Sequence, residues 1–292
     1  MPSLKEVRNR ITSVSSTMQI TSAMKMVSAA KLKKAQDAIV QMRPYSQKLS
    51  EILGNLSKSV DTSENPFAEE RGTEKVLVVA ITSNRGLCGA FNANIAKGVR
   101  HFQAEHTASN ISVLPIGKKA FDAFKKSGSL CESPNLPADG NYLFDNLTFE
   151  NVSELAEKLM LAFTEGEFDK VVLVYNRFKN AATQIVTTEQ FLPVVTEVDT
   201  ESNGSSTDYF FEPSKEEILG EIIPKSLKTQ LFKALLDSFA SEHGARMTAM
   251  HKATDNATDL IKELKLTYNK ARQASITKEI LEIVGGAEAL NN

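Results

Sequence analysis

Residues 4–42 read LKEVRNRITSVSSTMQITSAMKMVSAAKLKKAQDAIVQM, and the spacing of their apolar side chains decides the fold. Successive apolar positions lie three and four residues apart, which is typical of a coiled-coil seam. The spacing continues to residue 56, so the pattern predicts one helix on the order of 80 Å long. The predicted seam residues are Leu4, Val7, Ile11, Val14, Met18, Leu32, Ala35, Ile39, Met42, Leu49, Leu53 and Leu56.

Three polar residues interrupt this seam. Thr21, Lys25 and Ser28 stand where apolar residues are expected. Either the seam drifts around the helix at this point, or this stretch faces something other than its helical partner.

A second long helix is predicted in the C-terminal part of the chain. The spacing of three and four returns after Pro213 and runs almost to residue 290, with Pro224 expected to bend or break it. Because the two helical stretches flank the rest of the chain and are similar in length, they can pair only as an antiparallel coiled coil.

The middle of the chain has a different pattern. Residues 76–82, VLVVAIT, form a short and continuously apolar run, as in a strand buried on both faces. Further strands are predicted at 111–116, 171–175 and 184–194, with helices at about 92–105, 118–127 and 150–165. Alternating strands and helices predict a Rossmann-like α/β sheet domain inserted into the coiled coil. The predicted domains are a helix over 1–58, the sheet domain over 75–200 and a helix over 213–290.

Charge is distributed unevenly along the 292 residues. Residues 1–58 carry ten Lys or Arg and three Asp or Glu, whereas the whole chain has a net charge of −2. A basic arm on an acidic body predicts an acidic partner, which is a nucleic acid, an anionic lipid or an acidic protein surface. No apolar run reaches the roughly 18–20 residues that span a bilayer. The two cysteines favour a reducing compartment. We also expect no removable leader, because the helical period starts at Leu4 and continues without a break.

Candidate catalytic chemistry is sparse. The turn at 82–89, TSNRGLCG, contains glycines but matches neither the P-loop pattern (Gly-x4-Gly-Lys-Ser/Thr) nor the dinucleotide-binding pattern (Gly-x-Gly-x-x-Gly). Tight strand-to-helix turns need glycine in any case. Cys88 lies on this turn without a histidine in a triad-like context, so we expect it to be a packing residue. No histidine, cysteine and acid cluster has metal-ligand spacing. The basic arm also lacks the interleaved aromatics of many single-strand binders, so no nucleic-acid partner is expected.

Several separated motifs resemble one known family. Residues 20–31 (ITSAMKMVSAAK) and 83–89 (SNRGLCG) are similar to the gamma subunits of F-type ATP synthases. So are residues 245–257 (ARMTAMHKATDNA), 266–280 (LTYNKARQASITKEI) and 282–287 (EIVGGA). These motifs lie in the family's order and extend over nearly the whole chain.

The resemblance implies a rotating shaft rather than an enzyme. The helix pair would turn inside a ring of three alpha and three beta subunits and couple proton flow through the membrane ring to ATP synthesis or hydrolysis. The lower end would bind the epsilon subunit and the c-subunit ring. Nucleotide chemistry would belong to alpha and beta, so no cofactor or metal is expected in this chain. The location implied is the cytoplasmic face of a bacterial cell membrane, peripheral and reached only through the complex.

The resemblance also implies roles for individual residues. The expected interface with alpha and beta comprises Met24, Lys25, Arg246, Gln273, Thr277 and Glu279. The expected hydrophobic bearing comprises Ile280, Ile283, Val284 and Leu290. The expected contact with the c ring comprises Tyr209, Phe211 and Glu212. Lys25 departs from the family, since many relatives carry an acid there, and Phe211 replaces a tyrosine of some relatives.

Two other functions are compatible with the pattern. One is a doubly wound nucleotide- or small-ligand-binding protein that dimerises through its terminal helices, with a phosphate-binding turn at Gly86–Gly89. The other is a static coiled-coil scaffold.

Overall fold

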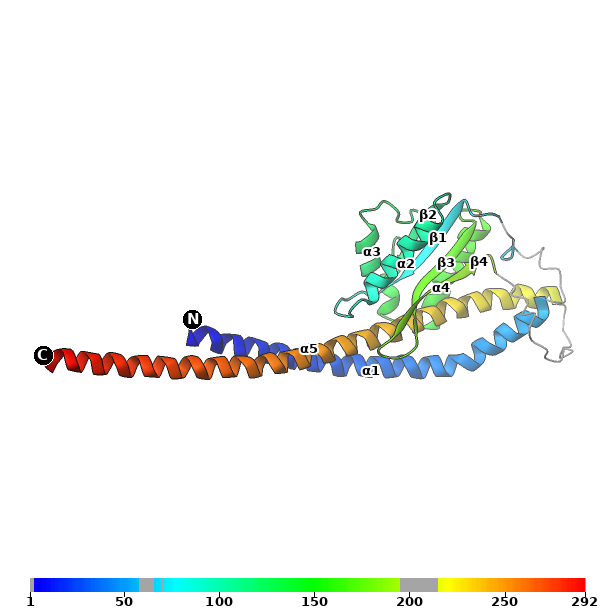
Figure 1. The fold of residues 1–292 in the computed structure, drawn as a ribbon. Helices are drawn as coiled ribbons and strands as arrows, with labels where there is room; N and C mark the ends of the chain where they lie inside the picture. Colours follow the sequence, from blue (N-terminus) through cyan, green and yellow to red (C-terminus); the bar gives the residue numbers. More distant parts are fainter. Residues whose placement is uncertain (1–2, 58–65, 70, 195–214, 292) are drawn as a thin grey trace. The chain divides into compact units, whose positions relative to one another are not determined.

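The chain is described by a computed structural model that covers residues 3–57, 66–69, 71–194 and 215–291. The candidate ring contacts Tyr209, Phe211 and Glu212 lie outside these residues. The elements in chain order are α1 (Leu4–Ser57), β1 (Lys75–Ile81), α2 (Phe91–Glu105), β2 (Asn110–Ile116), α3 (Lys118–Phe124), the 3-10 turn η2 (Asn141–Phe144), α4 (Phe149–Thr164), β3 (Lys170–Phe178), β4 (Gln184–Leu192) and α5 (Lys215–Asn291) (Figure 1).

The chain forms two compact units. One comprises residues 1–28 and 247–292, and the other comprises residues 29–246. Both long helices run through both units. The domains expected from the sequence divide the chain differently, into the two terminal helices and the sheet domain between them. This division stays a proposal.

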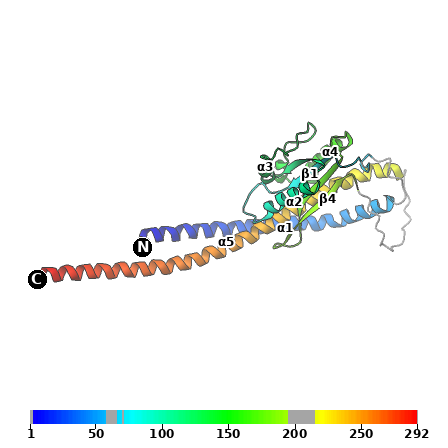
Figure 2. The same cartoon turned by 45° about the horizontal axis from the view of Figure 1, so that its top comes forward.

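The first unit is an antiparallel helix pair. Residue numbers rise along α1 as those of the contacting residues fall along α5. Arg8 Nη2 donates to the Tyr268 hydroxyl at 2.7 Å, and Lys25 Nζ lies 3.5 Å from His251 Nδ1. In Figures 1 and 2 the blue start of α1 lies alongside the orange stretch of α5. The antiparallel coiled coil predicted from the sequence is therefore confirmed.

The polar positions of the seam face the partner helix. The hydroxyls of Thr21 and Thr254 are 2.8 Å apart, and Thr258 Oγ1 donates to Met18 Sδ at 3.4 Å. The sequence left open whether the seam drifts around the helix here or faces something other than the partner helix. At Thr21 and Lys25 neither is the case, because both side chains contact α5. The seam continues there and is closed by side-chain hydrogen bonds.

The second unit is built on a four-stranded sheet with the order β2-β1-β3-β4. The first three strands are parallel, and β4 pairs antiparallel with β3. Strand β1 lies in the middle, and all its residues from Val76 to Ile81 are buried. Its unbroken apolar run is explained by helices on both faces of the sheet.

Two apolar cores cover the two faces. Alternate residues of β1, such as Val76 and Val78, pack with α2 and α3, whereas Leu77 and Val79 pack with α4 and α5 (Figure 1). The part of α5 in the second core comprises Ile223, Leu227, Leu231, Ala234 and Leu235. This stretch of the C-terminal helix therefore belongs to the sheet core.

The sequence predicted a bend or a break at Pro224, and the structure shows that α5 is not broken there. A proline inside a helix removes one hydrogen bond and costs roughly 3 kcal/mol. Its neighbours Ile223 and Leu227 are only 4% and 3% exposed, and their burial against the sheet offsets this cost.

Candidate functional site

The turn after β1 carries a polar site of the second unit. It lies at the carboxyl end of the sheet, beside the point where β1 has β2 on one side and β3 on the other. In doubly wound sheets, ligands bind at such a point. The geometry of this turn therefore decides whether the fold carries a ligand site.

The turn is anchored to α5 by Arg246. Its Nε donates to the Gly86 carbonyl oxygen at 3.3 Å, and its Nη2 donates to the carbonyl oxygens of Arg85 and Gly86 at 3.0 and 3.2 Å. Its Nη1 donates to Glu242 Oε1 at 2.6 Å and lies 3.3 Å from His243 Nδ1. The Arg246 and Glu242 side chains are 8% and 9% exposed, so the ion pair is buried.

Burial also determines the charge states beside Arg246. Loss of hydration raises the pKa of Glu242, although its bond to Arg246 acts in the opposite direction. Burial, reinforced by the positive charges of Arg246 and Lys31, lowers the pKa of His243 to about 3. His243 is therefore neutral at pH 7, and its Nδ1 is free to accept a hydrogen bond from Arg246.

A second polar cluster supports the turn from the start of α2. Asn92 Oδ1 accepts from the Ser83 backbone N–H at 3.0 Å, and Asn92 Nδ2 donates to Cys88 Sγ at 3.2 Å. Cys88 is 2% exposed, and burial raises the pKa of its thiol. The thiol is therefore a buried hydrogen-bond partner, in agreement with the packing role expected from the sequence.

The carboxyl end of β3 is occupied by α5 as well. Ser241 Oγ donates to the Asn176 carbonyl oxygen at 2.9 Å, and Asn176 Nδ2 donates to the Phe91 carbonyl oxygen at 3.2 Å. A Cβ on Gly244 would lie 3.1 Å from the Ala181 Cα, so α5 passes very close to the β3–β4 hairpin here. The position of a ligand in a doubly wound fold is thus filled by this chain's own helix.

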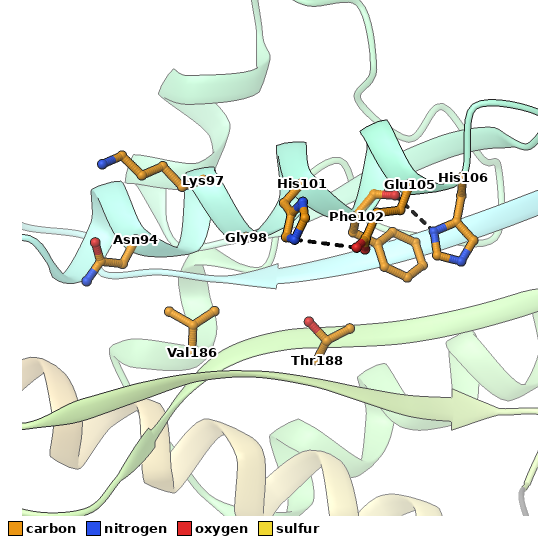
Figure 3. A pocket seen from close by; sticks show the side chains of 9 residues that line it. All are labelled: Asn94, Lys97, Gly98, His101, Phe102, Glu105, His106, Val186 and Thr188. Atoms are coloured by element: carbon orange, nitrogen blue, oxygen red, sulfur yellow. Dashed lines mark hydrogen bonds and ion pairs between the residues drawn. The ribbon is translucent and has the colours of Figure 1, made fainter.

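A groove lies between α2 and β4. Its volume is about 710 Å³, and Val186 and Thr188 of β4 point toward α2 across it (Figure 3). Both histidines of this groove contact residues of α2: His101 Nε2 lies 3.4 Å from Glu105 Oε1, and His106 Nδ1 lies 3.0 Å from the Phe102 carbonyl oxygen. No group of three possible metal ligands occurs within the described ranges.

The expected interface residues are distributed over both units. Met24 and Lys25 are half-buried in the helix pair, whereas Gln273, Thr277 and Glu279 are exposed on α5. Arg246 is different, because it is buried and its donors bond within the chain. Its expected contact with a partner subunit stays a prediction.

The expected bearing residues lie on the last turns of α5. The side chains of Ile280, Ile283 and Val284 are 54%, 71% and 54% exposed. Leu290 lies on the same helix, and its side chain is outside the described set. Across the described helices, none combines the length and apolarity that a membrane crossing requires.

Sequence reasoning missed three members of the turn site, namely Glu242, His243 and Asn92. Glu242 and Arg246 are four residues apart, a spacing that places them on one helix face. This spacing is the signal for an ion pair, and it does not show that the pair is buried.

Comparison with known proteins agrees with this architecture. The ATP synthase family model matches residues 3–290. The ATP synthase gamma chain of Flavobacterium johnsoniae is 61% identical over 292 residues, with both chains covered completely, and that of Cytophaga hutchinsonii is 56% identical over 300 residues, again with complete coverage.

Solved structures show the same fold. A chain of the Tetrahymena thermophila mitochondrial ATP synthase central stalk and c ring matches with a TM-score of 0.56 and 26% identity, over 80% of this chain and 99% of that one. A chain of the Euglena gracilis mitochondrial ATP synthase matches with a TM-score of 0.67 and 24% identity, over 98% of this chain and 94% of that one. The protein described here belongs to the ATP synthase gamma chain family.

Proposed function

We propose that this chain is the central rotor shaft of a proton-translocating ATP synthase and couples ion flow to ATP synthesis or hydrolysis by rotation. The observation that carries the proposal is the family match over residues 3–290, together with the antiparallel pairing of α1 and α5. A long helix pair resists twisting better than a single helix, and this property is needed to transmit torque.

The end of α5 supports a rotating contact. Ile276, Ile280, Ile283 and Val284 are each about half exposed or more. Apolar side chains make contacts without fixed directions, so a surface of this kind turns against a partner with few specific bonds to break. We assign Ile280, Ile283, Val284 and Leu290 to this bearing.

Alpha and beta subunits, three of each, are the proposed partners of the shaft. The residues assigned to this interface are Met24, Lys25, Gln273, Thr277 and Glu279, with Arg246 as a further candidate. Beside them on α1, the exposed Lys31, Lys33 and Lys34 form a basic cluster. Such a cluster fits an acidic surface of a partner protein.

The chain is proposed to be non-catalytic within the complex. The carboxyl end of its sheet is filled by α5, and the turn after β1 directs the carbonyl oxygens of Arg85 and Gly86 toward Arg246. A phosphate cradle needs backbone N–H groups at this position. The alternative of a nucleotide-binding protein with a phosphate turn at Gly86–Gly89 is therefore not supported.

The proposed location is the cytoplasmic face of a bacterial cell membrane. The chain is expected to be held there only through the complex, with the epsilon subunit and the c ring bound at its lower end. Tyr209, Phe211 and Glu212 are the residues proposed to contact the ring.

Affinity purification tests the assignment. A tagged chain should bring down two homologous nucleotide-binding subunits of about 50–55 kDa, together with ATPase activity. Calorimetry on the isolated chain should show no ATP binding at micromolar concentrations. Capture of neither subunit, or micromolar ATP binding by the pure chain, would contradict the proposed function.

A further inference from the structure

The N–H groups of the Arg246 guanidinium all have acceptors within the chain. A guanidinium has five N–H donors in a planar fork. Two carbonyl oxygens of the turn, one carboxylate oxygen of Glu242 and one ring nitrogen of His243 surround it at 2.6–3.3 Å. These four acceptors take five contacts, so the fork is saturated within the chain.

The turn bound by Arg246 contains a residue in an unfavourable backbone conformation. Leu87 has a φ of 64°, in the left-handed region, and its side chain is largely exposed. For a residue with a Cβ this conformation costs roughly 1–2 kcal/mol. The exposed Leu87 side chain has little packing to offset this cost, so the bonds on either side of it must hold the turn.

Bonds from two helices hold the turn, in addition to those that Ser83 and Asn84 make within the sheet unit. Asn92 of α2 binds the Ser83 N–H at the start of the turn and the Cys88 thiol directly after Leu87. Arg246 of α5 binds the carbonyl oxygens of Arg85 and Gly86, directly before Leu87. Of these two, only Arg246 connects the turn to the long C-terminal helix.

We propose that Arg246 is a positioning residue that fixes the turn at residues 83–89 onto α5, so that the carboxyl end of the sheet and this helix move as one body. Glu242 orients the guanidinium from one turn earlier in the helix, and it neutralises the buried charge. Any effect of this positioning on the coupling of rotation to ATP hydrolysis rests on the proposed rotor function. The positioning of the turn by Arg246 does not depend on that function.

Hydrogen exchange in the full-length chain tests the positioning. Arg246→Lys keeps a positive charge beside Glu242 but lacks the planar fork, so it cannot bridge two carbonyl oxygens and a carboxylate together. We expect amide exchange at Ser83 and Phe91, both hydrogen-bonded in the structure, to become about tenfold faster or more. Exchange in β2 should not change. Arg272→Lys, an exposed change on the same helix, is the matched control.

A double variant separates positioning from stability. Glu242→Leu with Arg246→Met removes the buried pair without leaving one charge unpartnered, and such replacements are often neutral or stabilising. We expect its melting temperature to remain near that of the wild type while exchange at Ser83 and Phe91 is still at least about tenfold faster. Exchange within about twofold of the wild type in both variants overturns the proposal.

The reconstituted complex tests the consequence for coupling. If the positioning matters for rotation, Arg246→Lys should lower the number of protons pumped per ATP hydrolysed, and Arg272→Lys should not. Fast exchange at the turn with unchanged coupling overturns this consequence and leaves the rotor assignment intact. Failure of the purification experiment would instead remove the rotor assignment, while the exchange result would still stand.

Discussion

Asp237 on α5 provides a quantitative test of the charge distribution in the sheet unit. The residue is 8% exposed and is surrounded by Lys233, Arg177 and Arg43, with Glu189 also near. Burial raises its pKa from 3.8 to about 6, even though the three cations act against this rise. The folded chain therefore binds a proton that the unfolded chain has released between these two pH values, so stability falls as pH rises through this window.

The size of the effect follows from the shift. A rise of about two pKa units corresponds to about 3 kcal/mol, because each unit is worth about 1.36 kcal/mol. Asp237→Asn cannot ionise, so it should raise the free energy of unfolding by about 3 kcal/mol at pH 7.5 and by only about 1 kcal/mol at pH 4.5. At neutral pH this gain corresponds to a rise in melting temperature of about 6–12 °C.

Thermal unfolding of the isolated chain, followed by circular dichroism at both pH values, measures this difference. Asp255→Asn is the control, because this side chain is 61% exposed on the same helix and its replacement should change stability by less than about 0.5 kcal/mol. A destabilising effect of Asp237→Asn at pH 7.5, or a gain equal at both pH values, would refute the reasoning.

Three further predictions concern the helix pair, the basic cluster and the sheet. Cysteines at Thr21 and Thr254, whose hydroxyls are 2.8 Å apart, should cross-link within one chain; cross-links only between chains would indicate dimerisation instead. Reversal of Lys31 and Lys33 to Glu should lower rotation-coupled ATPase in the reconstituted complex, with a loss that shrinks as salt screens the charges, and unchanged turnover at low salt would contradict the electrostatic contact. Gly117→Ala should cost more than about 2 kcal/mol in thermal unfolding, because φ is +106° and the new Cβ would overlap the Thr82 carbonyl oxygen; a wild-type melting temperature would refute this steric argument.

The elements of the sheet unit could be predicted closely from the sequence. The apolar run from Val76 corresponds to β1, and the helix expected at about 92–105 corresponds to α2 at Phe91–Glu105. Continuous apolar runs and periods near four residues are local signals, so they need no knowledge of the partner element. The antiparallel direction of β4 follows from its short connection to β3: only residues 179–183 separate the two strands, and a parallel crossover needs a dozen or more.

The turn site was beyond prediction from the pattern alone. A helical period shows that one face of α5 is apolar, but not that Leu231 packs on a sheet while Met250, further along, is buried in the helix-pair unit. For the same reason, Arg246 could be matched to a family position but not to the two carbonyl oxygens it binds. Backbone carbonyls carry no sequence signal, so bonds to them become visible only in three dimensions.

The pairing of the first helix with the last has a consequence during synthesis. Lys25 leaves the ribosome 226 residues before its partner His251. At typical translation rates of 5–20 residues per second, α1 therefore waits roughly 10–45 s for the helix that covers its seam. An uncovered apolar seam would favour aggregation during this time. The polar residues Thr21, Lys25 and Ser28 replace apolar side chains in the middle of the seam, so the nascent chain exposes less apolar surface before α5 is complete.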